Sequence, residues 1–333
     1  MKIIKNSMIY TAMLLLSFPI IAQAHVKWFT EEVTQRAKLG DILSTPFIIS
    51  AVVSAVVLLI LPALIDYLDK LDWAQTAEEM LDRCRSYSTY ILQYGVAIGL
   101  ALQILYRSVL VPELDVNSNV LYWVMGATIL VLLIPKAIFR KIAAALLLYL
   151  FVYQLWTAGA LHMLDYGFYV AIALAFLVEN TAWERYKYSI LYVGIGLSLC
   201  WVSLEKWIFP GMGLNILENY PVPTFGFTPE TFLMLTGFIE FAVGFLFLIG
   251  VLNRVLAIVV TLLFILTTMI FGTDELVGHF IVHILMIVFI IEGTRRSPMP
   301  ISGFRTVGQK TVFMLLSFLP FLAILFSLYY NLA

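Results

Sequence analysis

Apolar runs about as long as a membrane is thick recur along this chain, and they constrain its fold more than any other feature. A helix needs about 20 mostly apolar residues to cross the hydrocarbon core of a bilayer. Hydrophobic residues make up 62% of the 333 residues, charged residues only 12%, and the mean hydropathy is +0.96. An average soluble domain is about half apolar and about one quarter charged. The sequence therefore predicts an all-α, polytopic bundle of membrane-spanning helices, with the lipid bilayer as its partner.

Residues 1–24 have the features of a cleaved secretory signal peptide. Lys2 and Lys5 form a basic start, an apolar run follows, and Ala22-Gln23-Ala24 supplies the small residues that signal peptidase recognises. Cleavage there would make His25 the first residue of the mature protein. A terminal histidine offers an α-amine and an imidazole, and this pair can chelate one copper ion. Some residue must follow any cleavage site, so His25 is a candidate metal ligand and no more.

Ten apolar segments after the signal peptide are predicted to span the membrane. Their limits are 46–65, 88–107, 119–134, 142–160, 166–181, 188–206, 230–250, 255–271, 278–292 and 311–330. The two shortest, 119–134 and 166–181, could instead form one re-entrant arrangement, but the charge pattern favours two spans. Segment 66–86 carries both signs of charge and predicts a surface helix on the cytoplasmic side.

The lysines and arginines between the predicted spans indicate the orientation of the chain, because cytoplasmic loops are enriched in them. With the mature N-terminus outside, thirteen fall on the inner side and five on the outer side. The thirteen are Lys70, Arg83, Arg85, Lys136, Arg140, Lys141, Arg185, Lys187, Arg254, Arg295, Arg296, Arg305 and Lys310; the five are Lys27, Arg36, Lys38, Arg107 and Lys206. This distribution predicts a protein of the bacterial inner membrane with both mature termini in the periplasm.

Several classes of protein are disfavoured by the same composition. The net charge of -1 argues against a strongly basic nucleic-acid binder, so no nucleic-acid partner is expected. Cys84 is predicted in the cytoplasm and Cys200 inside the membrane, which leaves no disulfide framework. No P-loop, dinucleotide fingerprint, nucleophile elbow or haem-attachment motif is present.

Segments 88–181 and 188–293 look like two copies of one four-helix unit. The matching residues are Ile98-Gly99-Leu100 with Ile195-Gly196-Leu197, Arg140-Lys141 with Asn253-Arg254, and Glu179 with Glu292. The offset between matches grows along the chain by about sixteen residues, which fit in the Gly- and Pro-containing loop 207–229. Four spans per copy is an even number, so both copies would share one orientation, as in parallel transporter repeats.

The second copy carries a series of glycine and charge motifs. They are Gly194-x-Gly196, Ser203-Leu204-Glu205-Lys206, Gly237-Phe238-Ile239-Glu240 with Gly244 and Gly250, Asn253-Arg254, and Gly278-His279. With these motifs the segment resembles the DoxX-like family of four-helix membrane proteins, and 88–181 resembles a degenerate copy. The resemblance implies association with membrane redox complexes, such as a thiosulfate:quinone oxidoreductase or a superoxide-handling assembly, but no single activity. Segment 25–87 and the final helix at 311–330 lie outside the family unit.

Ionisable groups inside predicted spans are costly and tend to be functional. Glu240 falls near the middle of its span, where a carboxylate should be protonated or paired with a cation. Gly237 and Gly244 on the same helix fit equally well with close packing and a structural hydrogen bond. His279 and His283 are four residues apart and share one helix face, where they can hold one metal ion or bond to neighbouring helices.

Other polar residues map to the predicted outer half. Glu205 could face the bundle and join the histidines, whereas Lys206 is expected to reach the headgroups. His162 is expected at an exposed interface, and Asp274 and Glu275 in a solvated outer loop.

Two functional hypotheses follow. One is a periplasm-facing redox or metal-handling protein that binds copper or zinc and meets a quinone from the bilayer. Its functional candidates are Glu205, Glu240, His279 and His283, with His25, His279 and His283 as metal ligands. The other is a non-enzymatic scaffold for a redox partner, or a small-solute carrier. The outer histidines favour the first, and the lack of a complete ligand motif favours the second.

Overall fold

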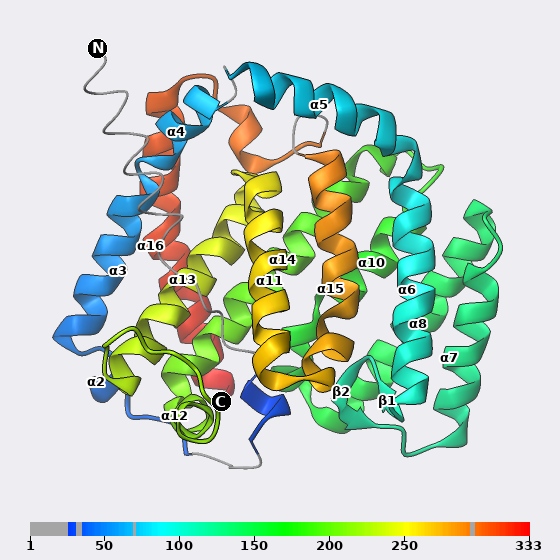
Figure 1. Ribbon diagram of the computed structural model, residues 1–333, viewed down its shortest axis with the longest axis horizontal. Coiled ribbons are helices and arrows are strands. Elements are labelled where there is room, and N and C mark those ends of the chain that lie inside the picture. Colours follow the sequence, from blue (N-terminus) through cyan, green and yellow to red (C-terminus); the bar gives the residue numbers. More distant parts are fainter. Residues whose placement is uncertain (1–25, 31–34, 69–70, 294–296) are drawn as a thin grey trace.

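The computed structural model describes residues 26–30, 35–68, 71–293 and 297–333, and this part of the chain is helical apart from one short hairpin. Within it, eight helices are long and apolar enough to cross a membrane, and one bent pair of helices makes a ninth. Consecutive long helices run in opposite directions (Figure 1). The chain thus has the architecture of a multi-pass membrane bundle, as its composition predicts.

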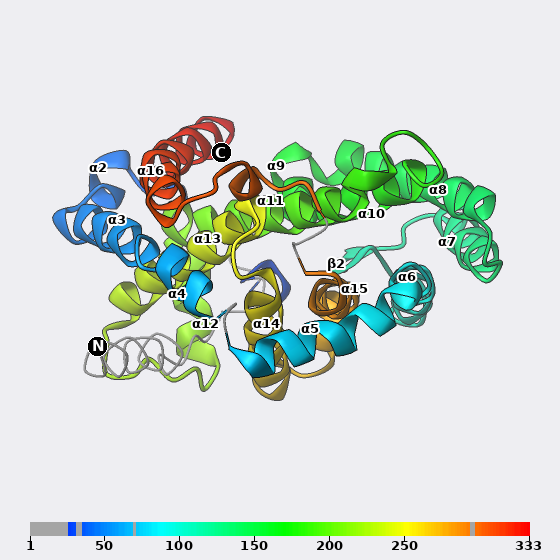
Figure 2. The same ribbon diagram turned by 90° about the horizontal axis from the view of Figure 1, so that it is seen from above.

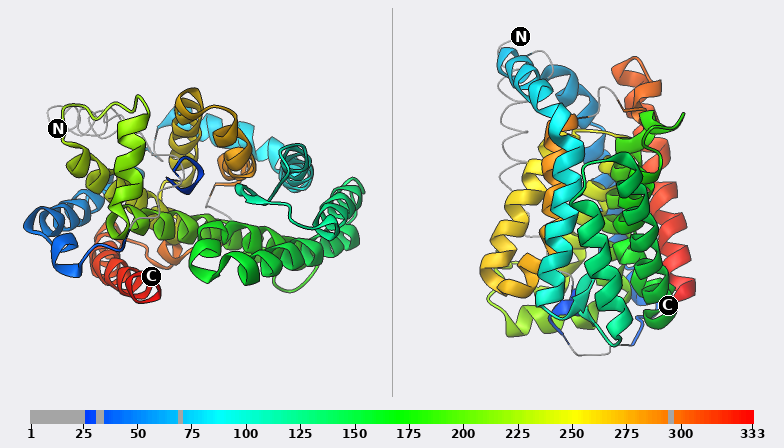
Figure 3. Two further views of the ribbon diagram at one scale, coloured as in Figure 1. Left: turned by 90° about the horizontal axis from the view of Figure 1, so that it is seen from below. Right: turned by 90° about the vertical axis from the view of Figure 1, so that its right-hand side faces the viewer.

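Eight helices from the middle of the chain form a closed ring (Figure 3, left). Each packs against the next along the chain, and the last packs against the first. At this closure Gly95 and Gly99 leave room for Ile284 and Ile281. In chain order the ring consists of α6 (Ser88–Leu105), α7 (Asn119–Leu132), α8 (Ala137–Ala158), α10 (Phe168–Leu177), α11 (Lys187–Ile208), α13 (Pro229–Ile249), α14 (Asn253–Phe271) and α15 (Thr273–Glu292).

Three further helices lie outside the ring. They are α3 (Thr45–Leu58), α4 (Leu61–Leu68) and α16 (Val307–Leu332). Helix α3 packs against α13, α16 packs against α11, and α4 packs against α16. Helix α5 (Asp72–Cys84) lies across one end of the bundle and contacts α15 (Figures 1 and 2). The opposite end carries β1 (Ser108–Val109), β2 (Val111–Asp115), α12 (Pro210–Asn219) and the C-terminus (Figure 1). These are called the α5 end and the α12 end below.

Some predicted spans differ from the observed helices. Helix α7 has only 14 residues, or about 21 Å, which is shorter than a bilayer core. The span predicted at 166–181 begins earlier and is broken, because α9 (Ala160–Met163) and η3 (Leu164–Tyr166) are bent by 60° from α10. Helices α8 and α15 each start five residues before their predicted limits. Polar residues at these two helix starts suggested loops, but they are paired inside the bundle.

Helices α11 and α13 approach each other through small residues. A Cβ on Gly196 would lie 2.6 Å from the carbonyl oxygen of Gly244, and one on Gly244 would lie 2.7 Å from Sγ of Cys200. Such contacts between small residues are how membrane helices pack closely. Helix α12 lies within the segment 207–229 that was predicted as an insertion, while the internal repeat itself stays a prediction.

Candidate functional site: a buried acidic cluster at the α12 end

Residues 26–30, here called the strap, enter the ring at the α12 end (Figure 3, left). They start with the single turn η1 (Val26–Trp28). The Trp28 indole lies over Gly278 of α15, where a Cβ would come within 2.1 Å of the ring. Its Nε1 donates to the hydroxyl of Tyr166 at 3.0 Å, and its ring centroid lies 4.8 Å from that of His279. A glycine on α15 therefore provides the seat for the strap.

The rest of the strap contacts α12 and α14. The Phe29 ring lies 4.6 Å from Phe271, centroid to centroid, and Oγ1 of Thr30 donates to Oδ1 of Asn215 at 3.0 Å. Apolar and polar contacts thus fix the strap on two sides of the ring opening.

Lys27 of the strap is paired with two carboxylates inside the ring. Its Nζ lies 2.6 Å from Oδ2 of Asp165 and 3.0 Å from Oε1 of Glu205. The side chains of Asp165 and Glu205 are 0% and 1% exposed. Asp165 belongs to η3, so the break before α10 is what brings this carboxylate into the ring.

The sequence suggested that Lys206 reaches the lipid headgroups, and this prediction is wrong. Lys206 pairs with Glu240 instead. Its Nζ donates to Oε2 of Glu240 at 2.6 Å, and the lysine side chain is 1% exposed. Side chains on a helix point toward its N-terminus, so Lys206, in the last turn of α11, is directed toward the middle of that helix. The close approach of α11 and α13 then places the carboxylate within reach, so Glu240 has the cation partner that its burial requires.

Glu275 is fully buried within α15, whereas the sequence suggested a solvated loop. Its Oε1 accepts a hydrogen bond from Oγ1 of Thr267 at 2.5 Å and lies 3.2 Å from Nδ1 of His279, four residues later on the same helix face. The Phe264 ring stacks on the imidazole of His279 with centroids 4.0 Å apart. His283 lies one turn farther along the helix and meets the edge of the same phenyl ring at 5.9 Å.

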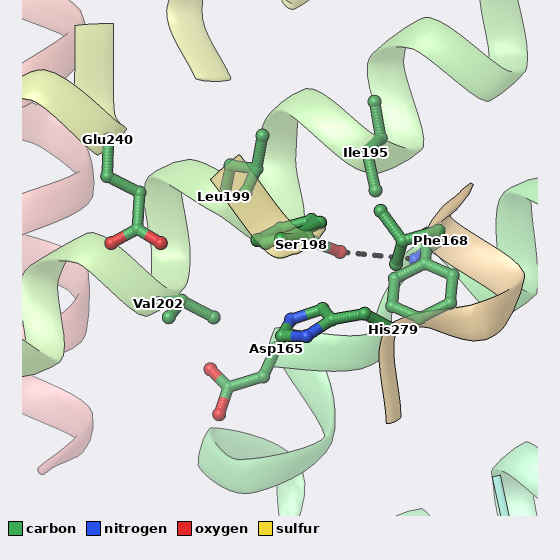
Figure 4. Close-up of a pocket in the computed structure, with 10 residues that line it drawn as sticks. Asp165, Phe168, Ile195, Ser198, Leu199, Val202, Glu240 and His279 are labelled. Atoms are coloured by element: carbon green, nitrogen blue, oxygen red, sulfur yellow. Dashed lines mark hydrogen bonds between the residues drawn. The ribbon is translucent and has the colours of Figure 1, made fainter. Parts of the chain in front are cut away.

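A small cavity lies beside part of this group of residues (Figure 4). Its polar lining comes from Asp165, Ser198, Glu240 and His279, supplied by four different elements. Its volume of about 20 Å³ compares with the roughly 10–15 Å³ that one water needs. Pockets for drug-sized molecules start at about 300 Å³, so a water or a bare ion fits and a quinone ring does not.

The buried acidic cluster consists of Asp165, Glu205, Glu240 and Glu275 with Lys27, Lys206 and His279, so it holds more carboxylates than lysines. Three of the carboxylates pair with the two lysines, and Glu275 pairs with His279. Three of the four carboxylates also have one oxygen without a hydrogen-bond partner in the described part of the chain. These oxygens are Asp165 Oδ1, Glu205 Oε2 and Glu275 Oε2. Buried polar atoms are almost always partnered, and unpaired buried charge is costly. The cluster therefore has both the charge and the acceptor atoms for a further cation or for protons.

A second polar group connects the cluster to the hairpin. The Tyr166 hydroxyl, which accepts from Trp28, donates to Oε1 of Glu113 on β2. Nε2 of His162 lies 3.0 Å from the same oxygen. The side chains of His162 and Glu113 are 24% and 14% exposed, so this pair lies closer to the surface. His162 is thus half-buried and partnered rather than simply exposed at the interface.

The structure brings together some of the predicted residues and leaves others apart. The cluster contains Glu205, Glu240 and His279. His283 does not line the cavity, and His25 lies outside the described residues, two positions before the lysine of the strap. Among the residues that the structure describes, no three His, Cys, Asp or Glu side chains are grouped so as to hold a metal ion.

Sequence reasoning missed Lys27, Asp165 and Glu275. Glu275 could have been found, because it precedes His279 by four residues and must share its helix face. Lys27 stands alone among Val26, Trp28 and Phe29, an isolated charge in an apolar stretch. Asp165 carries no local signal, since its burial depends on the bend between η3 and α10.

Comparison of the chain with models of protein families, with curated proteins and with solved structures found no match.

Proposed function

We propose that this chain is a DoxX-like protein of the bacterial inner membrane that handles a metal cation at its periplasmic face, in association with redox chemistry. The proposal is carried by the buried acidic cluster, in which three carboxylate oxygens lack a partner and carboxylates outnumber lysines. Ionisable groups inside membrane-spanning helices are costly and tend to mark functional sites. The distribution of lysines and arginines between the predicted spans supports a periplasmic position for the α12 end and the cluster.

The donor types favour copper or zinc. Imidazole nitrogen suits both metals, and carboxylate oxygen can complete their coordination. Within the acidic cluster, His279 and Glu275 hold a nitrogen donor and an oxygen donor side by side. A third strong donor would come from His25, whose α-amine and imidazole both become available if the signal peptide is removed after Ala24. Two positions separate His25 from Lys27, which contacts the cluster directly.

The size of the cavity limits the chemistry further. A volume near 20 Å³ admits an ion with about one water, so a larger reactant would have to meet the site from outside the ring. Copper would make the site redox-active and zinc would not. The DoxX resemblance favours the redox role, with a quinone in the bilayer or a partner protein as the electron acceptor or donor.

Metal titration of neighbouring variants tests the proposal. The protein, purified in detergent and stripped with a chelator, should bind about one Cu²⁺ or Zn²⁺ per chain. Glu275→Gln should weaken binding about tenfold or more, because it removes a charge beside the imidazole. Asp274→Asn is the matched control, since Asp274 is the exposed preceding residue and should leave affinity unchanged. A wild-type chain that binds neither ion would overturn the proposal and favour the scaffold or carrier.

A further inference from the structure

The loop between α12 and α13, residues 220–228, carries an exposed aromatic turn. The amide of Phe227 donates to the Thr224 carbonyl at 3.1 Å, and the side chains of Phe225 and Phe227 are 50% and 45% exposed. The two central residues, Phe225 and Gly226, have φ angles of 55° and 84°, as in a type I′ turn. A bulky residue in this left-handed region is strained, so the surrounding structure must enforce the turn. Phe225-Gly226-Phe227 is called the aromatic tip below.

Residues on both sides of the aromatic tip fix its position. Pro221 and Pro223 restrict the backbone before it, and Val222 between them is buried. After the tip, the side chain of Thr228 accepts a hydrogen bond from the amide of Thr231 and so caps α13. The two exposed phenyl groups are therefore carried by a loop whose backbone is held at both ends, so their exposure is built into the fold.

The aromatic tip lies at the perimeter of the bundle, at the level where two spans end. Seen along the bundle axis, the loop between α12 and α13 runs along the outer edge (Figure 3, left). Helix α13 starts directly after this loop at Pro229, and Tyr220 packs against Phe271 at the end of α14 with centroids 4.9 Å apart. Met269, in the same last turn of α14, is largely exposed. The tip thus continues the apolar outer surface of the membrane-spanning helices.

A small apolar cluster, separate from the main core, lies between the aromatic tip and the strap. On one side, the Phe225 ring lies 6.5 Å from that of Phe232, centroid to centroid. On the other side, Phe29 of the strap packs on Phe271 at 4.6 Å and on Tyr220 at 5.9 Å. The buried members of the cluster are Ile216, Val222, Phe232 and Phe271. So small a core depends on the segments at its edges, and the tip and the strap are two of them.

We propose that the aromatic tip inserts into the bilayer leaflet at the α12 end and, through the small apolar cluster, holds the strap in its seat on α15. Lipid is the occupant, because the tip continues the outer surface of the spans and residues 220–228 carry no charge. Aromatic side chains at such an edge bury in the boundary between headgroups and acyl chains. The strap is then fixed twice, by Gly278 inside the helix ring and by the membrane at its rim. This inference needs no bound cation, so it is tested independently of the proposed function.

Spin labels test the insertion directly. In a Cys84→Ser background, where the remaining Cys200 is buried, Phe227→Cys and Glu218→Cys each take one label. Glu218 is the matched control, because it is an exposed residue of α12 at the same end of the bundle. In vesicles of phosphatidylethanolamine and phosphatidylglycerol, the label at 227 should collide more often with oxygen, which concentrates in lipid, than with a water-soluble nickel complex. The label at 218 should show the reverse. Preference for nickel at both positions would overturn the proposal and indicate a surface open to a water-soluble protein.

Hydrogen–deuterium exchange of the strap tests the coupling. Phe227→Ser removes one inserted phenyl group, so the amides of residues 26–30 should exchange about tenfold faster in the same vesicles. Leu130→Ser is the matched control, because it removes an exposed apolar side chain of α7, on the opposite side of the bundle (Figure 1), and should leave the strap unchanged. Wild-type exchange in Phe227→Ser would show that the tip does not hold the strap. Equal acceleration in both variants would show a general loss of membrane contact, which also contradicts the proposal.

Discussion

Two buried polar clusters in this bundle differ in whether each of their charged and polar atoms has a hydrogen-bond or ion-pair partner. Near the α5 end, Arg140 forms a two-pronged ion pair with Glu179 at 2.5 and 2.7 Å, and its third nitrogen donates to Oε1 of Gln93 at 2.7 Å. The Gln93 amide in turn donates to the Leu132 carbonyl that ends α7. None of the side chains in this cluster is left with an unpartnered polar atom in the described part of the chain.

The cluster at the α12 end is as deeply buried but remains incomplete. Its carboxylates outnumber its lysines, and three of its oxygens lack partners among the described residues. Burial of charge in a membrane protein is thus no sign of function by itself. A cluster whose partners balance has its polar atoms paired within the fold, whereas the cluster at the α12 end has acceptor atoms that a cation or protons could use, as we propose.

The largest effect is expected where the balanced cluster is broken. Glu179→Gln leaves the buried guanidinium of Arg140 without a counter-charge, and removing one partner of a buried pair costs about 3–5 kcal/mol. Chemical unfolding in detergent should show this loss, while the cation affinity of the chain stays as in the wild type. If affinity fell together with stability, the two clusters would not be independent and the comparison would be wrong.

The next largest loss of stability is expected at the glycine of α15 on which the strap packs. Gly278→Ala places a methyl group within 2.1 Å of the Trp28 ring, and overpacking of this kind costs about 1–3 kcal/mol. Gly126→Ala in α7 is the matched helical control, since nothing lies within 4 Å of its Cβ position. It should be neutral or stabilise by up to about 1 kcal/mol. Equal thermal unfolding of both variants would mean that the strap does not dock on α15.

Substitution of the two histidines of α15, one at a time, tests whether the cavity is the cation site. His279→Asn should weaken cation binding about tenfold or more, because this imidazole lines the cavity beside Glu275. His283→Asn should leave binding unchanged, since His283 lies one turn away and outside the cavity lining. Calorimetric titration with Zn²⁺ measures both. Equal losses in the two variants would restore the symmetric two-histidine site that the sequence suggested.

The smallest effect on stability is expected for Glu205→Gln. The amide oxygen can still accept from Lys27, and one negative charge of an over-charged cluster is removed, so the free energy of unfolding should change by less than about 1 kcal/mol. This is the isosteric counterpart of Glu179→Gln. A loss as large as that of Glu179→Gln would show that Glu205 belongs to a structural ion pair.

The apolar framework could be predicted from the sequence because membrane-spanning helices have a strong local signal. The alternating long helices, the depth of Glu240 and the close packing at Gly244 all follow from composition and spacing along single segments.

The pairing of charges could not be predicted, because it depends on which helices are neighbours. The sequence predicted that Lys206 extends to the lipid headgroups. In the folded chain α13 lies beside α11, and Glu240 is 2.6 Å from the lysine. Glu275 read as loop because the polar run Thr273-Asp274-Glu275 hides the true start of α15. The role of Lys27 requires a segment outside the ring to fold back into it, which no periodicity encodes.

Elemental analysis of the wild-type protein, purified from membranes with its own signal peptide and sequenced from its N-terminus, tests the central claim most directly. The account predicts about one copper or zinc atom per chain, on a chain that starts at His25. A chain that starts at His25 and stays free of metal after equilibration with both ions would contradict it.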